Sequence, residues 1–366
     1  MLFGITFKVG LESVRDVIGD FMKYSGIGGQ AVMEGVMMRN GNKYAVAVRK
    51  PDNEIVVEKK EYKGIVDAKW NKIPLVRGVL SFIDSLVLGM STLMFSASFF
   101  EDEEEEPKKK KGKKPERVLT EEEKIKQEAK AQKQEKAMMT GVMIFSIVLA
   151  IAIFMVLPYY LSAAFQKLVP NQTVVAIFEG VIRLVIFIAY ILLISRMKDI
   201  QRVFMYHGAE HKCINCIESG LDLTVENVRK SSKEHKRCGT SFLVFVVVIA
   251  IILYLFIRVD AHALKIIIRL ALVPVIAGVS FELLRAAGRY DNALMNILSK
   301  PGMWMQQLTT KEPDDDMIEV GIASVEAIFD WKTYQKENFG KEFSEDVFEE
   351  ATEKEPIADE SITEEP

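Results

Sequence analysis

Hydrophobic and polar residues alternate along this chain in long blocks rather than singly. Segments 137–166 and 239–257 contain no charged residue, and segments 172–195 and 263–281 contain two each. A helix needs about 20 apolar residues to cross the hydrocarbon of a bilayer. The pattern therefore predicts four transmembrane helices and a mainly α, polytopic helical membrane protein that contacts the lipid bilayer.

A fifth apolar block, 73–100, is interrupted by charge. Arg77 and Asp84 lie within it, together with glycines and serines. A charge deep in lipid costs at least a few kcal/mol. We therefore expect an interfacial or membrane-packed helix here rather than a full span.

The residues before this block, 1–72, form a polar N-terminal module. Residues 1–25 have the spacing of an amphipathic helix. Residues 26–42 are rich in glycine and predict a loop. Residues 43–60 alternate in hydrophobicity around a turn at Pro51, which predicts a β-hairpin.

Charge separates the remaining segments. Residues 101–137 join an acidic run to a lysine-rich run and predict a charged linker, and 331–366 are acidic and predict a disordered tail. The four-helix domain, 138–330, includes the polar loop 197–238. Basic residues concentrate in the linker and in this loop, which predicts that linker, loop and C-terminus are cytoplasmic and that the loop belongs to a cytoplasmic cap.

Bulk composition excludes some functions. The formal net charge of −4 gives no general attraction for nucleic acid, so no nucleic-acid partner is expected. Three cysteines in 366 residues argue against a disulfide framework and for a reducing compartment.

Candidate chemistry concentrates in Tyr206–Phe242, which holds three of the four histidines and all three cysteines. His207 and His211 are four residues apart, so a helix places both rings on one side. Glu210 between them completes the HxxEH order of one metallopeptidase class, in which the histidines hold zinc and the glutamate is the general base.

The remaining ligands allow three interpretations. Glu282 at the end of the fourth span is the first candidate for a third ligand, with His235 and Cys238 as rivals. A second interpretation is a closed structural zinc site of the type CxxC and HxxC, made of Cys213, Cys216, His235 and Cys238. The third is that these residues are packed without metal.

The chain resembles a bacterial membrane-protein family typified by YqhQ and described as predicted metal-dependent enzymes. The resemblance rests on GGQAVMEGVMMR (28–39), PLVRG (74–78), YHGAEHK (206–212), LTVENVR (223–229), HKRCGTSF (235–242) and PGMWMQQLTTKEPDDDMIEV (301–320). It implies the bacterial cytoplasmic membrane and a metal. Cys216, His235 and Cys238 match family positions, whereas Cys213 stands where the family usually lacks cysteine.

These observations predict a zinc-dependent hydrolase, such as a peptidase, that uses Zn²⁺ or another divalent transition metal. Glu34 and Arg39 are predicted to bind its peptide or membrane-protein substrate. The alternative is a non-enzymatic assembly or partner-binding protein with a structural metal. A transporter is the third hypothesis, supported by Glu179 and Arg183, which are spaced to pair within a span.

Overall fold

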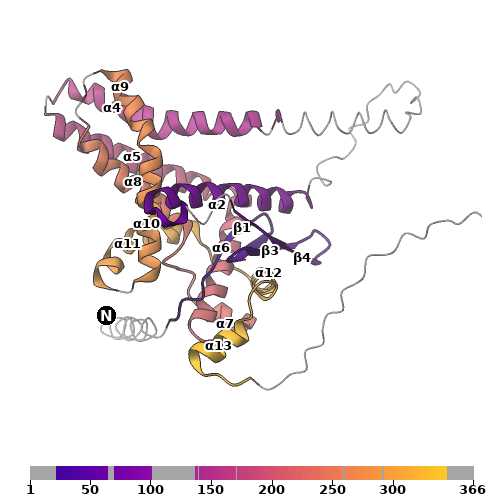
Figure 1. Ribbon diagram of the computed structural model, residues 1–366. Helices are drawn as coiled ribbons and strands as arrows, with labels where there is room; N and C mark the ends of the chain where they lie inside the picture. The colour runs from indigo at the N-terminus through magenta and orange to yellow at the C-terminus, as the bar shows by residue number, and fades with distance from the viewer. Residues whose placement is uncertain are drawn as a thin grey trace, which may run out of the picture.

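The computed structural model confirms a mainly helical chain with a small sheet near its N-terminus (Figure 1). It describes residues 22–64, 70–100, 137–138, 140–169, 171–257, 259, 261–290 and 292–343. The predicted linker lies outside these residues except at 137, as do most of the predicted N-terminal helix and residues 344–366 of the predicted tail.

The sheet has four antiparallel strands in the order β1-β2-β3-β4. They are β1 (Ile27–Val32), β2 (Gly35–Asn40), β3 (Lys43–Arg49) and β4 (Ile55–Glu61). The predicted hairpin is confirmed as β3–β4. The prediction of a loop at 26–42 is wrong, because this segment forms a second hairpin.

Close packing explains the glycines within strands. A Cβ at Gly35 would lie 2.3 Å from the carbonyl oxygen of Ala47 on β3. A Cβ at Gly29 would lie 2.9 Å from Cγ of Glu210. The glycines thus allow neighbouring elements to approach, and the tight turn falls instead at Glu34, which has a φ of 47°.

Successive side chains of a strand point to opposite faces of the sheet, and apolar residues on both faces are buried. Val36 and Met38 face a core shared with helices α6 (Lys198–Glu218) and α12 (Asp315–Glu326). Met37 and Val46 face Leu88 on α2 (Pro74–Ala97). The sheet is therefore held between α2 on one side and α6 with α12 on the other.

Four helices are long and apolar enough to cross a membrane: Pro74–Ala97, Thr140–Gln166, Gln172–Ile194 and His262–Arg289. Thr140–Gln166 contains η3 (Ala152–Val156) and ends with α4 (Leu157–Gln166), and His262–Arg289 is divided into α9 (His262–Ala271) and α10 (Val273–Arg289). Gln172–Ile194 is α5, and α8 (Gly239–Leu255) is a shorter apolar helix.

Three of the predicted spans correspond to three of these helices, and the fourth corresponds to the shorter apolar helix α8, which has 17 residues. α2 is also long and apolar enough to cross a membrane, despite Arg77 and Asp84. α2 packs along α10, and a Cβ at Gly78 would lie 2.7 Å from the carbonyl oxygen of Gly278. Its C-terminal half lies against the sheet, which Figure 1 draws below the helix.

α7 (Val225–Lys230) and α12 pack against α6 and, with α13 (Trp331–Phe339), build a compact module around it. α11 (Ala293–Thr309) packs along α8, and the short η1 (Trp70–Lys72) precedes α2. Thr224 caps α7 as its side chain accepts from the Asn227 backbone N–H. The disorder predicted from 331 is wrong for α13, because Trp331 and Gln335 are buried against this module.

Candidate metal centre

Three side chains converge where α6 meets the start of α8. His207 and His211 lie one helical turn apart on α6, and their ring centroids are 4.4 Å apart. Cys238 is the N-cap residue of α8. One ligand atom from each lies within 4.8 Å of the other two, so the three residues form a group that could hold a metal ion.

Backbone carbonyls fix the orientation of both imidazoles. Nδ1 of His207 lies 3.0 Å from the carbonyl oxygen of Thr309, and Nδ1 of His211 lies 2.6 Å from that of Lys233. A carbonyl only accepts hydrogen bonds, so each Nδ1 carries the proton and donates. Each Nε2 is then left for another partner, as in histidines that ligate metals.

The chemistry of the group fits a metal. Nε2 of His211 is buried and has no hydrogen-bond partner among the described residues. A buried polar atom without a partner is costly, and coordination would satisfy it. Imidazole and thiolate are also the ligand types preferred by zinc and its neighbours among the transition metals.

Cys238 lies where a thiolate is stabilised. Its Sγ is 3.2 Å from Nε2 of His207 and accepts a hydrogen bond from the Thr240 backbone N–H at 3.3 Å. The start of α8 adds the positive end of the helix dipole. Burial opposes ionisation, but the charges of His207 and His211 outweigh it and hold the pKa of Cys238 well below its usual range.

The same interaction affects His207. Burial favours its neutral ring, but the charge of Cys238 and the hydrogen bond to it raise the pKa of His207 to about 9. Without metal, the two side chains therefore form a thiolate–imidazolium pair. A metal ion would compete with the proton on Nε2 of His207.

Glu210 lies beside the group without belonging to it. It is buried on α6 and packs against Gly29 of β1, which approaches closely because it lacks a side chain. Burial raises the pKa of Glu210, although His207 and His211 partly offset this. A carboxyl with a raised pKa is suited to take up a proton near neutral pH.

Glu282, the first candidate for third ligand, is engaged elsewhere. Its two carboxylate oxygens accept from Nε and NH2 of Arg77, at 2.6 and 2.5 Å. Packing of α2 along α10 brings these two residues together. The charge predicted to need a partner at the end of the span thus finds it on α2, and Cys238 takes the third place.

His235 packs against the metal-binding group without belonging to it. Its backbone N–H donates to the Gln306 side chain at 2.9 Å, and its ring centroid lies 5.6 Å from that of His211. Nε2 of His235 is 3.8 Å from Glu218. Burial lowers the pKa of His235 to about 4 despite Glu218, so the ring is neutral and packs against His211.

The other two cysteines face away from the group. Both belong to the hydrophobic core around α6, and Cys213 lies against Gly321 on α12. Cys216 donates to the carbonyl oxygen of Asp222 at 3.4 Å. Burial raises the pKa of both thiols, that of Cys216 to about 11. The structure does not bring together the cysteines of the predicted closed zinc site.

The two predicted substrate-binding residues lie at opposite ends of the β1–β2 hairpin. Glu34, in the turn, pairs with Arg202 and accepts from the Tyr206 hydroxyl at 3.3 Å, next to His207. Arg39 donates to the Gly41 carbonyl oxygen at 2.8 Å and lies against the ring of Tyr62. The structure brings Glu34 to α6 but does not bring Arg39 there.

Three contributors were not predicted. The Thr309 and Lys233 carbonyls and the Thr240 N–H are backbone atoms, so no residue type marks them. The only sequence signal is proximity to distinctive strings, since Lys233 and Thr240 flank His235–Cys238 and Thr309 ends WMQQLT.

Sequence comparison shows which known proteins this chain is similar to. Residues 73–331 match the family described as "Protein of unknown function (DUF1385)". The chain is also 34% identical over 315 residues to "Uncharacterized protein YqhQ" of Bacillus subtilis (strain 168), covering 85% of this chain and 94% of that protein. No solved structure matches the chain.

Proposed function

This chain belongs to the DUF1385 family, and we propose that it is a metal-dependent hydrolase of the bacterial cytoplasmic membrane. His207, His211 and Cys238 would hold Zn²⁺ or another divalent transition metal. One observation carries the proposal: both imidazoles donate through Nδ1 to backbone carbonyls, so both Nε2 atoms are directed to other partners beside the Cys238 sulfur, and a metal ion would displace the proton that His207 shares with Cys238.

The number of ligands favours catalysis over a purely structural role. Closed structural zinc sites have four protein ligands, whereas catalytic sites have three and leave one position for water or substrate. Among the residues that the structure describes, the group of histidine, cysteine and carboxylate ligands has three members. His207 is partly exposed, whereas His211 and Cys238 are buried.

The metal ion and the protein side chains would have separate roles in hydrolysis. When bound, the ion would act as a Lewis acid and would acidify a water molecule. Glu210 would accept the proton, since burial raises its pKa and it lies on the same helix between the two histidines. Thr309 and Lys233 would keep both rings oriented through their carbonyls.

Location suggests the class of substrate. The group lies at the start of the apolar helix α8, and the basic loop flanks predict that this end is cytoplasmic. Arg202, which precedes His207 on α6, forms an ion pair with Glu34 in the β1–β2 turn. We assign this pair to binding of a peptide or of a membrane-protein segment; Arg39 takes no part.

A substitution of Glu210 tests the reaction. Glu210→Gln keeps size and burial, so bound metal should stay unchanged while hydrolysis of a fluorogenic peptide library falls at least about 100-fold. Cys216→Ala is the matched control and should retain both metal and hydrolysis. Full hydrolysis by metal-loaded Glu210→Gln would contradict the role of Glu210.

Burial of the group favours a second candidate function. His211 and Cys238 are 1% and 5% exposed, as expected of a metal that ties α6 to α8 in a non-enzymatic, partner-binding protein. In that case chelation would loosen the module around α6. Glu210→Gln would also have no effect on any hydrolysis measured with the purified protein.

A further inference from the structure

Strand β1 forms one edge of the sheet, because the strand order gives it a single neighbour. Residue pairs in an antiparallel ladder alternate between those that exchange hydrogen bonds and those whose N–H and C=O groups point outward. Val32 and Gly35 close the two-residue turn between β1 and β2, so they form a pair of the first kind. Gly29 and Ala31 then belong to pairs of the second kind. Their main-chain groups therefore point away from β2, toward the free edge.

The free edge of β1 is open near its middle. Gly28 and Gly29 are exposed, and Gln30 and Ala31 are half-buried. A Cβ at Gly28 would meet no atom within 4 Å. A glycine inside a strand often marks a place where a ligand or another backbone approaches closely. The edge therefore leaves room for another chain beside its two exposed glycines.

The metal-binding group lies on the side of α6 that is turned toward this free edge. α12 contacts Ala209 and Cys213 of α6 through Gly321, and it packs over β2 and β3. A helix turns by about 100° per residue, so His207 and His211 lie about 160° away from these two positions, on the opposite side of α6. α6 itself packs on β1, the strand furthest from β4 (Figure 1). The group is therefore next to the edge strand rather than next to α12.

Glu210 connects the edge of β1 with the metal-binding group. A Cβ at Gly29 would lie 2.9 Å from Cγ of Glu210, and the Gly29 backbone N–H donates to the Glu210 carboxylate. The Ala31 N–H and C=O have no backbone partner among the residues that the structure describes. A chain that paired with Ala31 along this edge would pass beside Glu210.

Both ends of the edge strand are fixed to α6. Before β1, the Ser25 hydroxyl donates to Glu218 at the end of α6, at 2.7 Å. After β1, Glu34 forms an ion pair with Arg202 near the start of α6. The strand thus runs along the helix in the opposite direction and is held at each end. A preformed edge binds a ligand without the free-energy cost of ordering a loop.

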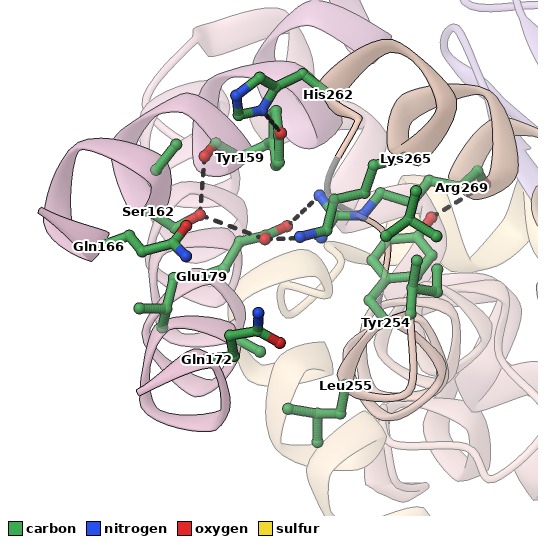
Figure 2. A pocket seen from close by; sticks show the side chains of 15 residues that line it. Tyr159, Ser162, Gln166, Gln172, Glu179, Tyr254, Leu255, His262, Lys265 and Arg269 are labelled. Atoms are coloured by element: carbon green, nitrogen blue, oxygen red, sulfur yellow. Dashed lines mark hydrogen bonds and ion pairs between the residues drawn. The ribbon is translucent and has the colours of Figure 1, made fainter. Parts of the chain in front are cut away.

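The polar cavity near Tyr254, at the other end of α8, is less suited to a peptide (Figure 2). Its volume is about 280 Å³, whereas typical ligand pockets have about 300–1,000 Å³. Glu179 in its wall accepts from Arg269 at 2.8 Å and, as predicted from their spacing, from Arg183 at 2.9 Å. The carboxylate of this wall is thus already paired within the protein.

We propose that an extended peptide segment binds as an added strand on the free edge of β1. This proposal rests on the proposed hydrolase function and specifies its substrate class, an unfolded chain rather than a helix. The main chain of the substrate would pair with Ala31 and with the Gly29 carbonyl, so binding would depend little on side chains. A helix uses its own main-chain groups internally, so a helical segment would have to unwind before it could bind.

Binding is measured separately from hydrolysis on metal-loaded Glu210→Gln in maltoside detergent, by fluorescence anisotropy with a fluorescein-labelled library of eight-residue peptides. Adding Ala31→Pro removes the outward N–H and places a ring on the edge, while the pairing of β1 with β2 is kept. It should raise the Kd about 10-fold or more. Adding Val57→Pro makes the same change on the outward side of β4, the opposite edge, and should leave the Kd unchanged. Both variants should keep the bound metal.

A second measurement leaves the protein unaltered. A library N-methylated at every amide cannot donate main-chain hydrogen bonds, and it should bind about 10-fold more weakly or worse than the unmodified library. The proposal is overturned if the unmodified library does not bind, if the two proline variants bind it equally, or if the two libraries bind equally.

Hydrolysis by the wild type separates this proposal from the proposed function. Hydrolysis that persists unchanged in Ala31→Pro overturns binding at the edge of β1 and leaves the hydrolase standing. Binding that depends on Ala31 and on the peptide amides, in a protein whose wild type does not hydrolyse the library, supports the peptide site and contradicts only the hydrolase.

Discussion

The two ends of α8 present polar clusters built on opposite principles. Near Tyr254, Arg183 and Arg269 share the single carboxylate of Glu179. At Cys238, neutral carbonyls occupy one nitrogen of each imidazole and leave the other available. The first cluster is held together by ion pairs within the protein, whereas the second gathers two imidazoles and a sulfur that could hold a metal ion. The partners of each side chain, rather than the residue types present, distinguish the two clusters.

The largest effect should come from removing the carboxylate that the two arginines share. Glu179→Gln leaves two buried arginines without a carboxylate, which should lower the free energy of unfolding by about 3–5 kcal/mol. Thermal unfolding in detergent, followed by circular dichroism, measures it. Glu179→Gln combined with Arg269→Gln should recover part of the loss. An unchanged unfolding temperature in the single variant would show that the cluster is not held by charge.

A smaller effect is expected at Glu218, beneath the metal group. It accepts from Arg237 NH2 at 2.5 Å and from the Ser25 hydroxyl at 2.7 Å. Glu218→Gln should cost about 1.5–3 kcal/mol at pH 7. The bound metal should be retained, because Glu218 supports the loop rather than the ion.

The pH dependence of this loss follows from the sign of the shift. Burial would raise the pKa of Glu218, but His235 and Arg237 outweigh it and lower the pKa to about 2. A lowered pKa stabilises the fold above the unfolded-state pKa of about 4.3 and ceases to do so as pH falls through about 2. The difference between wild type and Glu218→Gln should shrink over that window in acid-unfolding curves. A difference that is constant with pH would argue against an ionised Glu218.

The smallest effect should come from a cysteine outside the group. Cys213→Ala removes one buried atom beside Gly321 and should cost about 1 kcal/mol. Metal content, measured by mass spectrometry of the digested protein, should not change. Loss of metal in this variant would instead support the hypothesis of a closed zinc site that includes Cys213.

Sequence alone predicts local features well and long-range partners poorly. Spacing within one helix predicts that His207 and His211 face the same way and that Glu179 pairs with Arg183, and both predictions are confirmed. Thr224, which caps α7, is a residue type that is common at helix N-termini. These features depend on residues at most four positions apart.

Contacts between residues that are distant in sequence become evident only from the tertiary fold. Arg77 and Glu282 are 205 residues apart and meet because α2 packs along α10. The sequence predicts a loop in place of β1 and β2 because glycine is uncommon in strands, whereas here the glycines allow α6 and a neighbouring strand to approach. Cys238 competed with Glu282 and His235 as third ligand, since no local pattern shows which of them reaches His207.

Metal content tests the central claim most directly. Wild-type protein purified from its membrane should hold about one transition-metal ion per chain. His211→Ala and Cys238→Ala should lose it, while Cys216→Ala, an equally buried cysteine on the same helix as His211, should retain it. A wild-type protein without metal, or metal retained by both His211→Ala and Cys238→Ala, would contradict the assignment of His207, His211 and Cys238 as the metal centre.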